Sequence, residues 1–223
     1  MPSGQTVARL VIGDINYSSW SLRGWLALRA SGIDFEVVPV HLYVPGSREI
    51  LLTYSPSAKV PVYLEGDLTI WDTMAIIEYL AERHPCLWPT DRYLRAHARS
   101  VCNEMHSSFF TMRSLMPFNT RARDRRIPAT PALEADLTRI RELLADCREK
   151  YASRGQWLFG EFCAADILFA AVASRFRTYN VPADGLAGEY LRTILAHPWV
   201  REWDARAAAE PGVIPSLEVG RES

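Results

Sequence analysis

The periodicity of apolar residues changes abruptly at a proline-rich segment, and that change constrains the fold more than any other feature. Up to residue 85, short apolar stretches typical of strands alternate with stretches typical of helices. The segment His84–Pro89 contains two prolines and ends this alternation. Every long segment after it has helical periodicity. The sequence therefore predicts an α/β N-terminal domain over 1–85, a linker at 86–91 and an all-helical C-terminal domain over 92–223.

The first domain is expected to run in the order β-α-β-α-β-β-α. The expected strands are 9–12, 35–40, 60–64 and 68–70, and the expected helices are 21–30, 47–54 and 73–83. In the second domain, apolar residues recur every three or four positions from Leu94 to Met116 and from Leu133 to Tyr151, which predicts two long amphipathic helices. Further helices are expected over 164–178, 186–195 and 198–209.

Charge and composition limit the class of partner. The chain has 25 Lys and Arg against 26 Asp and Glu, so no overall field attracts it to nucleic acid or to an anionic membrane, and a small-molecule partner is expected. The longest apolar run, Ile167–Ala173, is far shorter than the roughly 20 residues of a membrane span. Four scattered cysteines without a CxxC pair, and no signal-peptide pattern, predict a reduced, cytoplasmic protein with no metal site.

A proline at the start of an apolar strand needs an explanation, because it has no N–H to donate to a strand ladder. Pro61 directly follows Val60 in such a segment. One explanation is that the strand lies at the edge of the sheet. The other is a cis Val60–Pro61 bond that turns the backbone of Val60 outward, where it can pair with an extended peptide-like ligand.

Polar residues stand at two predicted helix starts. Asp72 and Thr73 follow the strand at 68–70, so they are the natural N-cap and first-turn residues. A helix start of this kind also suits the carboxylate and ammonium of an α-amino acid head group. Ser18 and Ser19 precede the first helix, where one hydroxyl is expected to cap it and another to be able to donate a hydrogen bond to a thiolate.

Together these features resemble the cytosolic glutathione S-transferases of the serine-type, theta-like and zeta-like classes, over essentially the whole chain. Ser55–Val62 is similar to the family's cis-proline segment, Trp71–Leu80 to its acidic-hydroxyl motif and third helix, and Phe159–Ile167 to its C-terminal capping segment. The resemblance implies a thioredoxin-like N-terminal domain, glutathione as co-substrate, an electrophilic small molecule as second substrate, and a homodimer.

The resemblance also implies roles for individual residues. Val60, between Lys59 and Pro61, would pair through its backbone with the cysteinyl unit of glutathione. Asp72 and Thr73 would bind the γ-glutamyl head.

The thiolate would be held by Ser18 or Ser19, and counting back from Gly32 at the end of the helix favours Ser18. Tyr17 is an alternative, since other classes use a tyrosine. The absence of a cysteine in this loop argues against the cysteine-type classes. Trp20 stands where the zeta-like loop has a cysteine, which weakens the specific reading as a maleylacetoacetate isomerase.

The second substrate's pocket is expected between the two domains, against the first long C-terminal helix. His106 and Arg113, which flank Phe109 and Phe110, are expected to share a face that points into this cleft. The alternative for His106 is a partly buried residue at the edge of the core. The function predicted is a glutathione transferase. The alternatives are a glutathione-dependent isomerase and a non-catalytic binding protein. The loop hydroxyl and the acidic-hydroxyl pair both argue against the non-catalytic protein.

Overall fold

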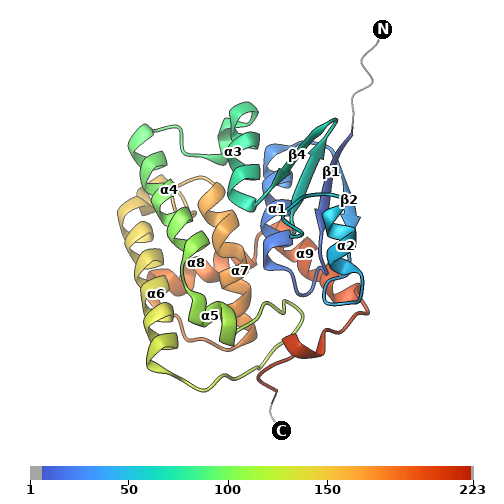
Figure 1. Ribbon diagram of the computed structural model, residues 1–223. Coiled ribbons are helices and arrows are strands. Elements are labelled where there is room, and N and C mark those ends of the chain that lie inside the picture. The colour runs from blue at the N-terminus through green and yellow to red at the C-terminus, as the bar shows by residue number, and fades with distance from the viewer. Residues whose placement is uncertain (1–6, 222–223) are drawn as a thin grey trace.

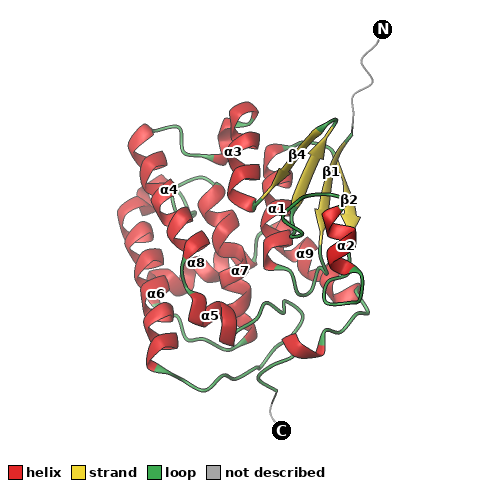
Figure 2. Ribbon diagram, viewed as in Figure 1, coloured by secondary structure: helices red, strands yellow, loops and turns green. Residues whose placement is uncertain are grey.

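The structure is a computed structural model that describes residues 7–221 (Figure 1). The strands are β1 (Ala8–Ile12), β2 (Phe35–Pro39), β3 (Val62–Glu65) and β4 (Leu68–Trp71). The helices beside the sheet are α1 (Ser19–Ser31), α2 (Ser47–Leu52) and α3 (Thr73–Arg83). The remaining helices are α4 (Arg92–Ser107), α5 (Phe110–Leu115), α6 (Pro131–Tyr151), α7 (Ala164–Thr178), α8 (Gly185–Leu195) and α9 (Pro198–Ala209). Figure 2 shows all the strands on one side of the molecule and helices through the rest.

The sheet has the order β2-β1-β3-β4, with β2 parallel to β1, and β3 and β4 in antiparallel pairing. Alternation along β1 sends Leu10 and Ile12 into the large core that contains α1 and α3. Val11 points to the opposite face, where it packs with Leu51 of α2. The sheet is therefore covered on both faces, as Figure 1 shows, and the predicted thioredoxin-like arrangement is confirmed.

The Val60–Pro61 peptide bond is cis. Pro61 immediately precedes β3, which is an inner strand between β1 and β4, so the explanation by an edge strand is wrong and the cis explanation is confirmed. Gly24 in α1 allows a close approach at this point, because a Cβ atom there would lie 2.8 Å from the Pro61 ring. Helix α1 thus packs directly against the turn that leads into β3.

A single apolar core extends from the sheet side into the helical part. Trp25 of α1 packs against Trp203 of α9 with ring centroids 5.5 Å apart. Helix α7 is buried along nearly its whole length, and its Asp166 accepts hydrogen bonds from the backbone N–H groups of Leu158 and Cys163, which closes the capping box at the start of the helix. Among residues 7–221, no helix is both long enough and apolar enough to span a bilayer.

The helix predicted from Leu94 to Met116 is wrong in one respect, because the structure breaks it between α4 and α5. Phe109 has φ 62°, in the left-handed region, which turns its side chain into the core. The guanidinium of Arg113 donates to the carbonyls of Ser108 (2.9 Å) and Met105 at the end of α4. A cation bonded to the last carbonyls of a helix offsets the loss of its continuing hydrogen bonds. Periodicity alone does not reveal such a break.

Candidate active site

The start of α1 is held by a network of hydroxyl groups. Ser18 is the N-cap residue, and its Oγ accepts from the backbone N–H of Ser21 (3.2 Å). The two serine Oγ atoms lie 2.7 Å apart, and Ser21 Oγ also accepts from the backbone N–H of Gly13 (2.9 Å). Ser18 and Ser19 are almost buried, and both line a cavity. The structure therefore assigns the capping role to Ser18 and leaves Ser19 outside this network.

The backbone of Val60 is open on the cavity side. Within residues 7–221, neither its N–H nor its carbonyl forms a hydrogen bond, because the β3–β4 ladder begins at Val62 and β1 pairs no further than Val62. Val60 and Lys59 line the same cavity as Ser18. A buried or half-buried backbone group without a partner is costly, so this edge is suited to pairing with an extended ligand.

The start of α3 carries the predicted acidic and hydroxyl pair. Asp72 is the N-cap residue, with φ 79°, and its Oδ1 accepts from the N–H of Met74 (2.8 Å). Its Oδ2 lies 3.2 Å from Nε2 of His106 on α4. Burial alone would raise the pKa of Asp72, but the hydrogen bonds from His106 and Met74 outweigh it and hold the pKa below its ordinary value. The hydroxyl of Thr73 is buried and has no partner among the described residues.

The C-terminal segment closes the lower end of the site. The Tyr17 hydroxyl donates to Glu218 (2.7 Å), and Asn119 donates to the same carboxylate oxygen (2.7 Å). Burial and this carboxylate raise the pKa of Tyr17. Leu217, the neighbour of Glu218, lines the cavity. The phenol of Tyr17 is therefore engaged with the C-terminal segment and is not free to serve a thiol.

A cavity of about 540 Å³ lies between the sheet side and the helices, and Asp72 and Thr73 at the start of α3 are not among its lining residues. Its lining consists of the loop after β1, the segment around α2, the turn before β3 and parts of the helical half. The residues are Tyr17, Ser18, Ser19, Trp20, Leu42, Tyr43, Ser47, Arg48, Leu51, Ala58, Lys59, Val60, Arg113, Pro117, Phe118, Arg175 and Leu217. A volume of this size is typical of small-molecule sites.

The helical side of the cavity carries two arginines that bond to backbone carbonyls, and the charge of Asp136 acts on one of them, Arg113. Arg175 of α7 donates to the carbonyl of Met116 (2.8 Å), and Arg113 donates to carbonyls at the end of α4. Neither forms a salt bridge with a described residue. Burial, together with the charge of Arg113, lowers the pKa of Arg175 to about 9. Such a pair attracts an anion into the cavity.

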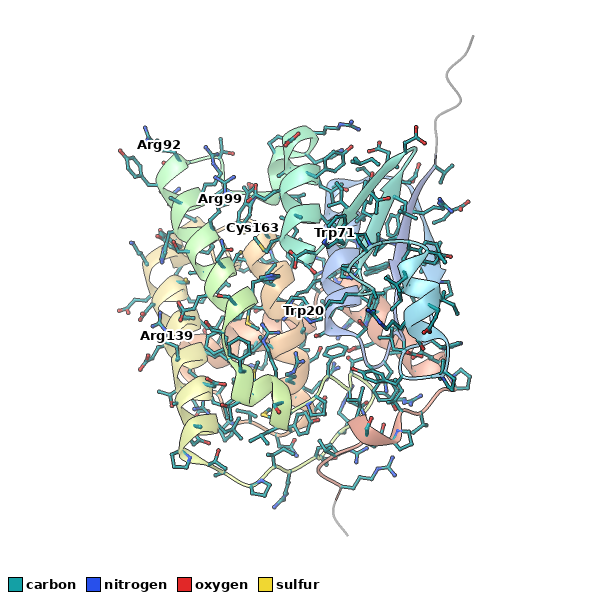
Figure 3. The ribbon with its side chains drawn as sticks, in the orientation of Figure 1. Trp20, Trp71, Arg92, Arg99, Arg139 and Cys163 are labelled. Atoms are coloured by element: carbon teal, nitrogen blue, oxygen red, sulfur yellow. The ribbon has the colours of Figure 1, made fainter. Side chains whose placement is uncertain are left out.

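Trp20 connects Arg113 to the start of α3. The guanidinium groups of Arg23 and Arg113 lie 4.6 Å and 4.9 Å from the centre of its ring, and the ring of His106 packs against it in a T-shaped contact at 5.2 Å. Since His106 also bonds to Asp72, a continuous set of contacts leads from the cavity to the N-terminus of α3. Figure 3 shows Trp20 between the sheet part and the helices α4 and α5, with Trp71 just before that N-terminus.

Of the residues predicted for the second pocket, Tyr17 lines the cavity, and the other four are separated by the break after α4. Arg113 lines the cavity. His106 is partly buried beside Asp72 and reaches the cavity only through Trp20, as described above. Phe109 is buried in the core, and Phe110 is 73% exposed, so neither is among the residues that line the cavity. The left-handed turn at Phe109 changes the direction of the helix and so undoes the face that regular spacing predicts.

Arg175 and Glu218 are among the functional residues that sequence reasoning missed. Arg175 follows the apolar run Ile167–Ala173 in α7, and an arginine beside such a run is a usable signal for a buried charge with a special partner. Glu218 lies close to the C-terminus, where nothing local indicates that its carboxylate reaches Tyr17, 201 residues earlier in the chain. Its position depends on tertiary packing alone.

Comparisons with known proteins agree with this geometry. Residues 17–83 match the family model of the glutathione S-transferase N-terminal domain. Rat maleylacetoacetate isomerase is 28% identical over 165 residues, which cover 71% of this chain and 74% of the relative. Glutathione S-transferase Z2 of Arabidopsis thaliana is 28% identical over 181 residues, or 78% of this chain and 81% of the relative.

A solved structure has the same fold over almost the whole chain. A glutathione transferase homologue from Burkholderia, crystallised with bound glutathione, superposes with a TM-score of 0.68 and 25% identity. The match covers 92% of this chain and 99% of that one. The similarity therefore includes both the sheet side and the helical side of the cavity.

Proposed function

Since the chain belongs to the cytosolic glutathione S-transferase family, we propose that it binds glutathione in this cavity and activates it as a thiolate. The sulfur is then delivered to an electrophilic carbon of a small molecule that carries a carboxylate. The observation that carries the proposal is the composition of one cavity, which has the Ser18 hydroxyl and the unpaired backbone of Val60 on one side and Arg113 and Arg175 on the other.

Glutathione binding is proposed to use main-chain and helix-start groups. The N–H and carbonyl of Val60 pair with the cysteinyl unit, next to Lys59 and the cis Pro61. At the start of α3, the hydroxyl and backbone N–H of Thr73 hold the γ-glutamyl carboxylate, and Asp72 holds the ammonium. The buried hydroxyl of Thr73, which lacks a partner among residues 7–221, supports this assignment.

Thiol activation is proposed to be of the serine type. A free thiol titrates near 8.5, and lowering its pKa by about two units requires about 2.7 kcal/mol of preferential stabilisation of the thiolate. A hydrogen bond from Ser18 supplies part of this, and the N-terminus of α1 and the nearby Arg113 and Arg175 add a favourable field. Catalysis then comes from the thiolate fraction and from holding both reactants together.

The two arginines favour an anionic second substrate. Arg175 is buried and Arg113 is half-buried among the lining residues, and each already donates to backbone carbonyls. A carboxylate between them recovers part of the desolvation cost of both cations and fixes the orientation of the electrophile. A neutral electrophile of the same shape gains neither contribution.

A glutathione-dependent isomerase is the second candidate, because a carboxylate-bearing substrate with an activated double bond fits the same cavity. In that reaction the thiolate adds to the double bond, rotation follows, and the thiolate leaves again with no net change in atoms. The similarity to rat maleylacetoacetate isomerase supports this candidate. Trp20, which lines the cavity, stands where zeta-like sequences have a cysteine, and this favours the transferase.

The proposal is tested by calorimetric titration of the protein with glutathione, S-methylglutathione and an analogue without the γ-glutamyl unit. We expect the first two to bind and the third to bind much more weakly. Turnover is then compared for matched electrophiles that carry a carboxylate or its methyl ester. If no binding occurs at millimolar glutathione, the catalytic proposal is wrong and a non-catalytic binding protein is the better account.

The family also suggests a two-fold homodimer in a reducing cytoplasm, which we include in the proposal. The four cysteines are free, and three of them are buried. Light scattering of the purified protein tests the dimer, with a mass near 50 kDa expected from about twice the 25.2 kDa chain.

A further inference from the structure

The buried hydroxyl of Ser21 has no role in the proposed mechanism so far. It is completely buried at the third position of α1, one helical turn after the N-cap Ser18. In a capping box, this residue bonds back to the N-cap backbone N–H. Here that N–H already donates to the carbonyl of Asp14 (2.9 Å), so the Ser21 side chain is free to bond elsewhere.

The direction of the bond between Ser18 and Ser21 follows from counting donors and acceptors. The backbone N–H of Gly13 is necessarily a donor, so Ser21 Oγ accepts there. If Ser18 donated to Ser21 as well, the proton of Ser21 would have no acceptor, because Ser18 Oγ is its only other partner among the described residues. A buried hydroxyl proton without an acceptor costs about 1–3 kcal/mol. If Ser21 instead donates to Ser18, the Ser21 proton has its acceptor in Ser18 Oγ.

In this favoured direction, Ser18 Oγ accepts two hydrogen bonds. One comes from the backbone N–H of Ser21 (3.2 Å), and the other comes from the Ser21 hydroxyl (2.7 Å). A hydroxyl oxygen has two lone pairs, so both are then occupied. Only the proton of Ser18 remains, and Ser18 lines the cavity. Acceptance of two bonds also polarises the hydroxyl and makes it a stronger donor.

We propose that Ser21 is a positioning residue, which donates its proton to Ser18 so that Ser18 offers only a proton to the sulfur of glutathione. The inference rests on the proposed function, in which Ser18 holds the thiolate. This arrangement distinguishes the thiolate of bound glutathione from its neutral thiol. A thiolate accepts the Ser18 proton, whereas a neutral thiol finds no free lone pair on Ser18 to which it can donate. The network thereby favours the charged form of the bound sulfur rather than glutathione as a whole.

The test is the pKa of the thiol of bound glutathione, measured from the ultraviolet absorbance of the thiolate as pH is varied. In Ser21→Ala we expect this pKa to rise by about one unit, and turnover at neutral pH to fall about tenfold. Affinity for S-methylglutathione, which has no thiol proton, is expected to change by less than about twofold. Arg48, Lys59, Arg113 and Arg175 line the same cavity in every variant, so their fields act equally on all of them.

Two further variants separate the possible outcomes. Ser31→Ala removes a buried hydroxyl at the other end of α1, where it donates to the carbonyl of Leu28, and is expected to leave the thiol pKa unchanged. Ser18→Ala tests the premise. If it leaves the pKa unchanged, the serine-type mechanism is wrong. If Ser18→Ala raises the pKa and Ser21→Ala does not, only the positioning role is overturned.

Ser21→Cys covers the case in which Ser21→Ala disturbs the loop, since the N–H of Gly13 then loses its acceptor. A thiol has nearly the same shape and is a weaker donor, so an intermediate thiol pKa with unchanged S-methylglutathione binding is expected. An unchanged thiol pKa in Ser21→Cys would show a merely structural role for Ser21. Weaker binding of S-methylglutathione in both Ser21 variants, in proportion to the change in thiol pKa, would show the same.

Discussion

The two sides of the cavity are built in different ways. The sheet-side wall, formed by 17–20, 42–51 and 58–60, presents the hydroxyl of Ser18, whose partner Ser21 lies close by in sequence, and the unpaired main chain of Val60. The helix-side wall, formed by Arg113, Pro117, Phe118, Arg175 and Leu217, presents two cations bonded to backbone carbonyls, of which that of Arg175 is 59 residues away in sequence. The main-chain groups of the sheet-side wall suit glutathione, which is the same in every reaction. The charged groups of the helix-side wall select among electrophiles, so the two walls divide glutathione binding from choice of the second substrate.

Replacement of Arg175 by Met breaks the helix-side wall and has the largest expected effect. Loss of a buried charge-assisted contact of about 2.7 kcal/mol lowers kcat/KM for a carboxylate-bearing electrophile about 100-fold. For the matched methyl ester, the change is expected to stay within about threefold. Arg177→Met is the control, since Arg177 lies on the same helix but pairs with Asp204 outside the cavity. An equal loss for both electrophiles would contradict a carboxylate site.

Replacement of Asp72 by Asn tests glutathione binding at the start of α3. We expect glutathione to bind about tenfold more weakly, because the amide no longer attracts the γ-glutamyl ammonium, while the analogue without that unit is unaffected. Asn is as good an N-cap as Asp, so α3 is preserved. Asp91→Asn is the matched control, because Asp91 caps α4 by the same bonds to N–H groups. Calorimetry checks both variants, and equal weakening by the control would remove the assigned role.

Replacement of Glu218 by Gln tests the segment that joins the two walls. Burial opposes ionisation, but hydrogen bonds from Tyr17, Arg221 and Asn119 lower the pKa of Glu218 to about 2. A depressed carboxyl pKa stabilises the fold above the ordinary value of 4.5, and this contribution disappears as pH falls through about 2. We expect the free energy of unfolding of the variant to be about 1–2 kcal/mol lower than that of the unaltered protein. This value allows for solvent screening of the ion pair with the exposed Arg221.

Urea unfolding at neutral pH and near pH 2 measures this contribution. At neutral pH the unaltered protein should be the more stable one, and at the lower pH the two proteins should converge. A difference that persists unchanged near pH 2 would mean that packing of the side chain, rather than its charge, holds the C-terminal segment.

The sheet-side wall was largely predictable because its signals are local. The hydroxyl at Ser18 and the cis bond before Pro61 each follow from a few neighbouring residues, as does the N-cap at Asp72 outside the wall. Short-range steric and hydrogen-bond rules decide such features.

The helix-side wall was only partly predictable because long-range packing decides it. Arg113 was expected at the cleft, but the turn at Phe109 that orients it depends on the core. Arg175 is buried by contact with the carbonyl of Met116, 59 residues away. Phe110, placed at the cleft by helical spacing, is exposed because α5 starts in a new direction. Periodicity assumes a continuous helix and contains no information about its interruptions.

Two histidines give the smallest predicted effects and extend the comparison beyond the cavity. A hydrogen bond from the ring of His41 to the carboxylate of Asp14 raises the pKa of His41, beside the sheet-side wall, above 6.5. Burial, together with the charge of Lys150, lowers the pKa of His97 in α4. The His41 contribution to stability is therefore present below pH 6.5 and lost as pH rises through its folded pKa. For His97 the sign is opposite, because stability is lost as pH falls below 6.5.

An NMR titration of the histidine ring protons measures both pKa values in one sample. We expect His41 to titrate above 6.5 and His97 below it, and Asp14→Asn to return only His41 toward 6.5. Assignment uses His41→Gln and His97→Gln. If Asp14→Asn left His41 unchanged, the carboxylate would not be holding the loop after β2 through that ring. The backbone N–H of Leu42, which donates to the other oxygen of Asp14 (2.7 Å), would then be the contact that shapes this side of the cavity.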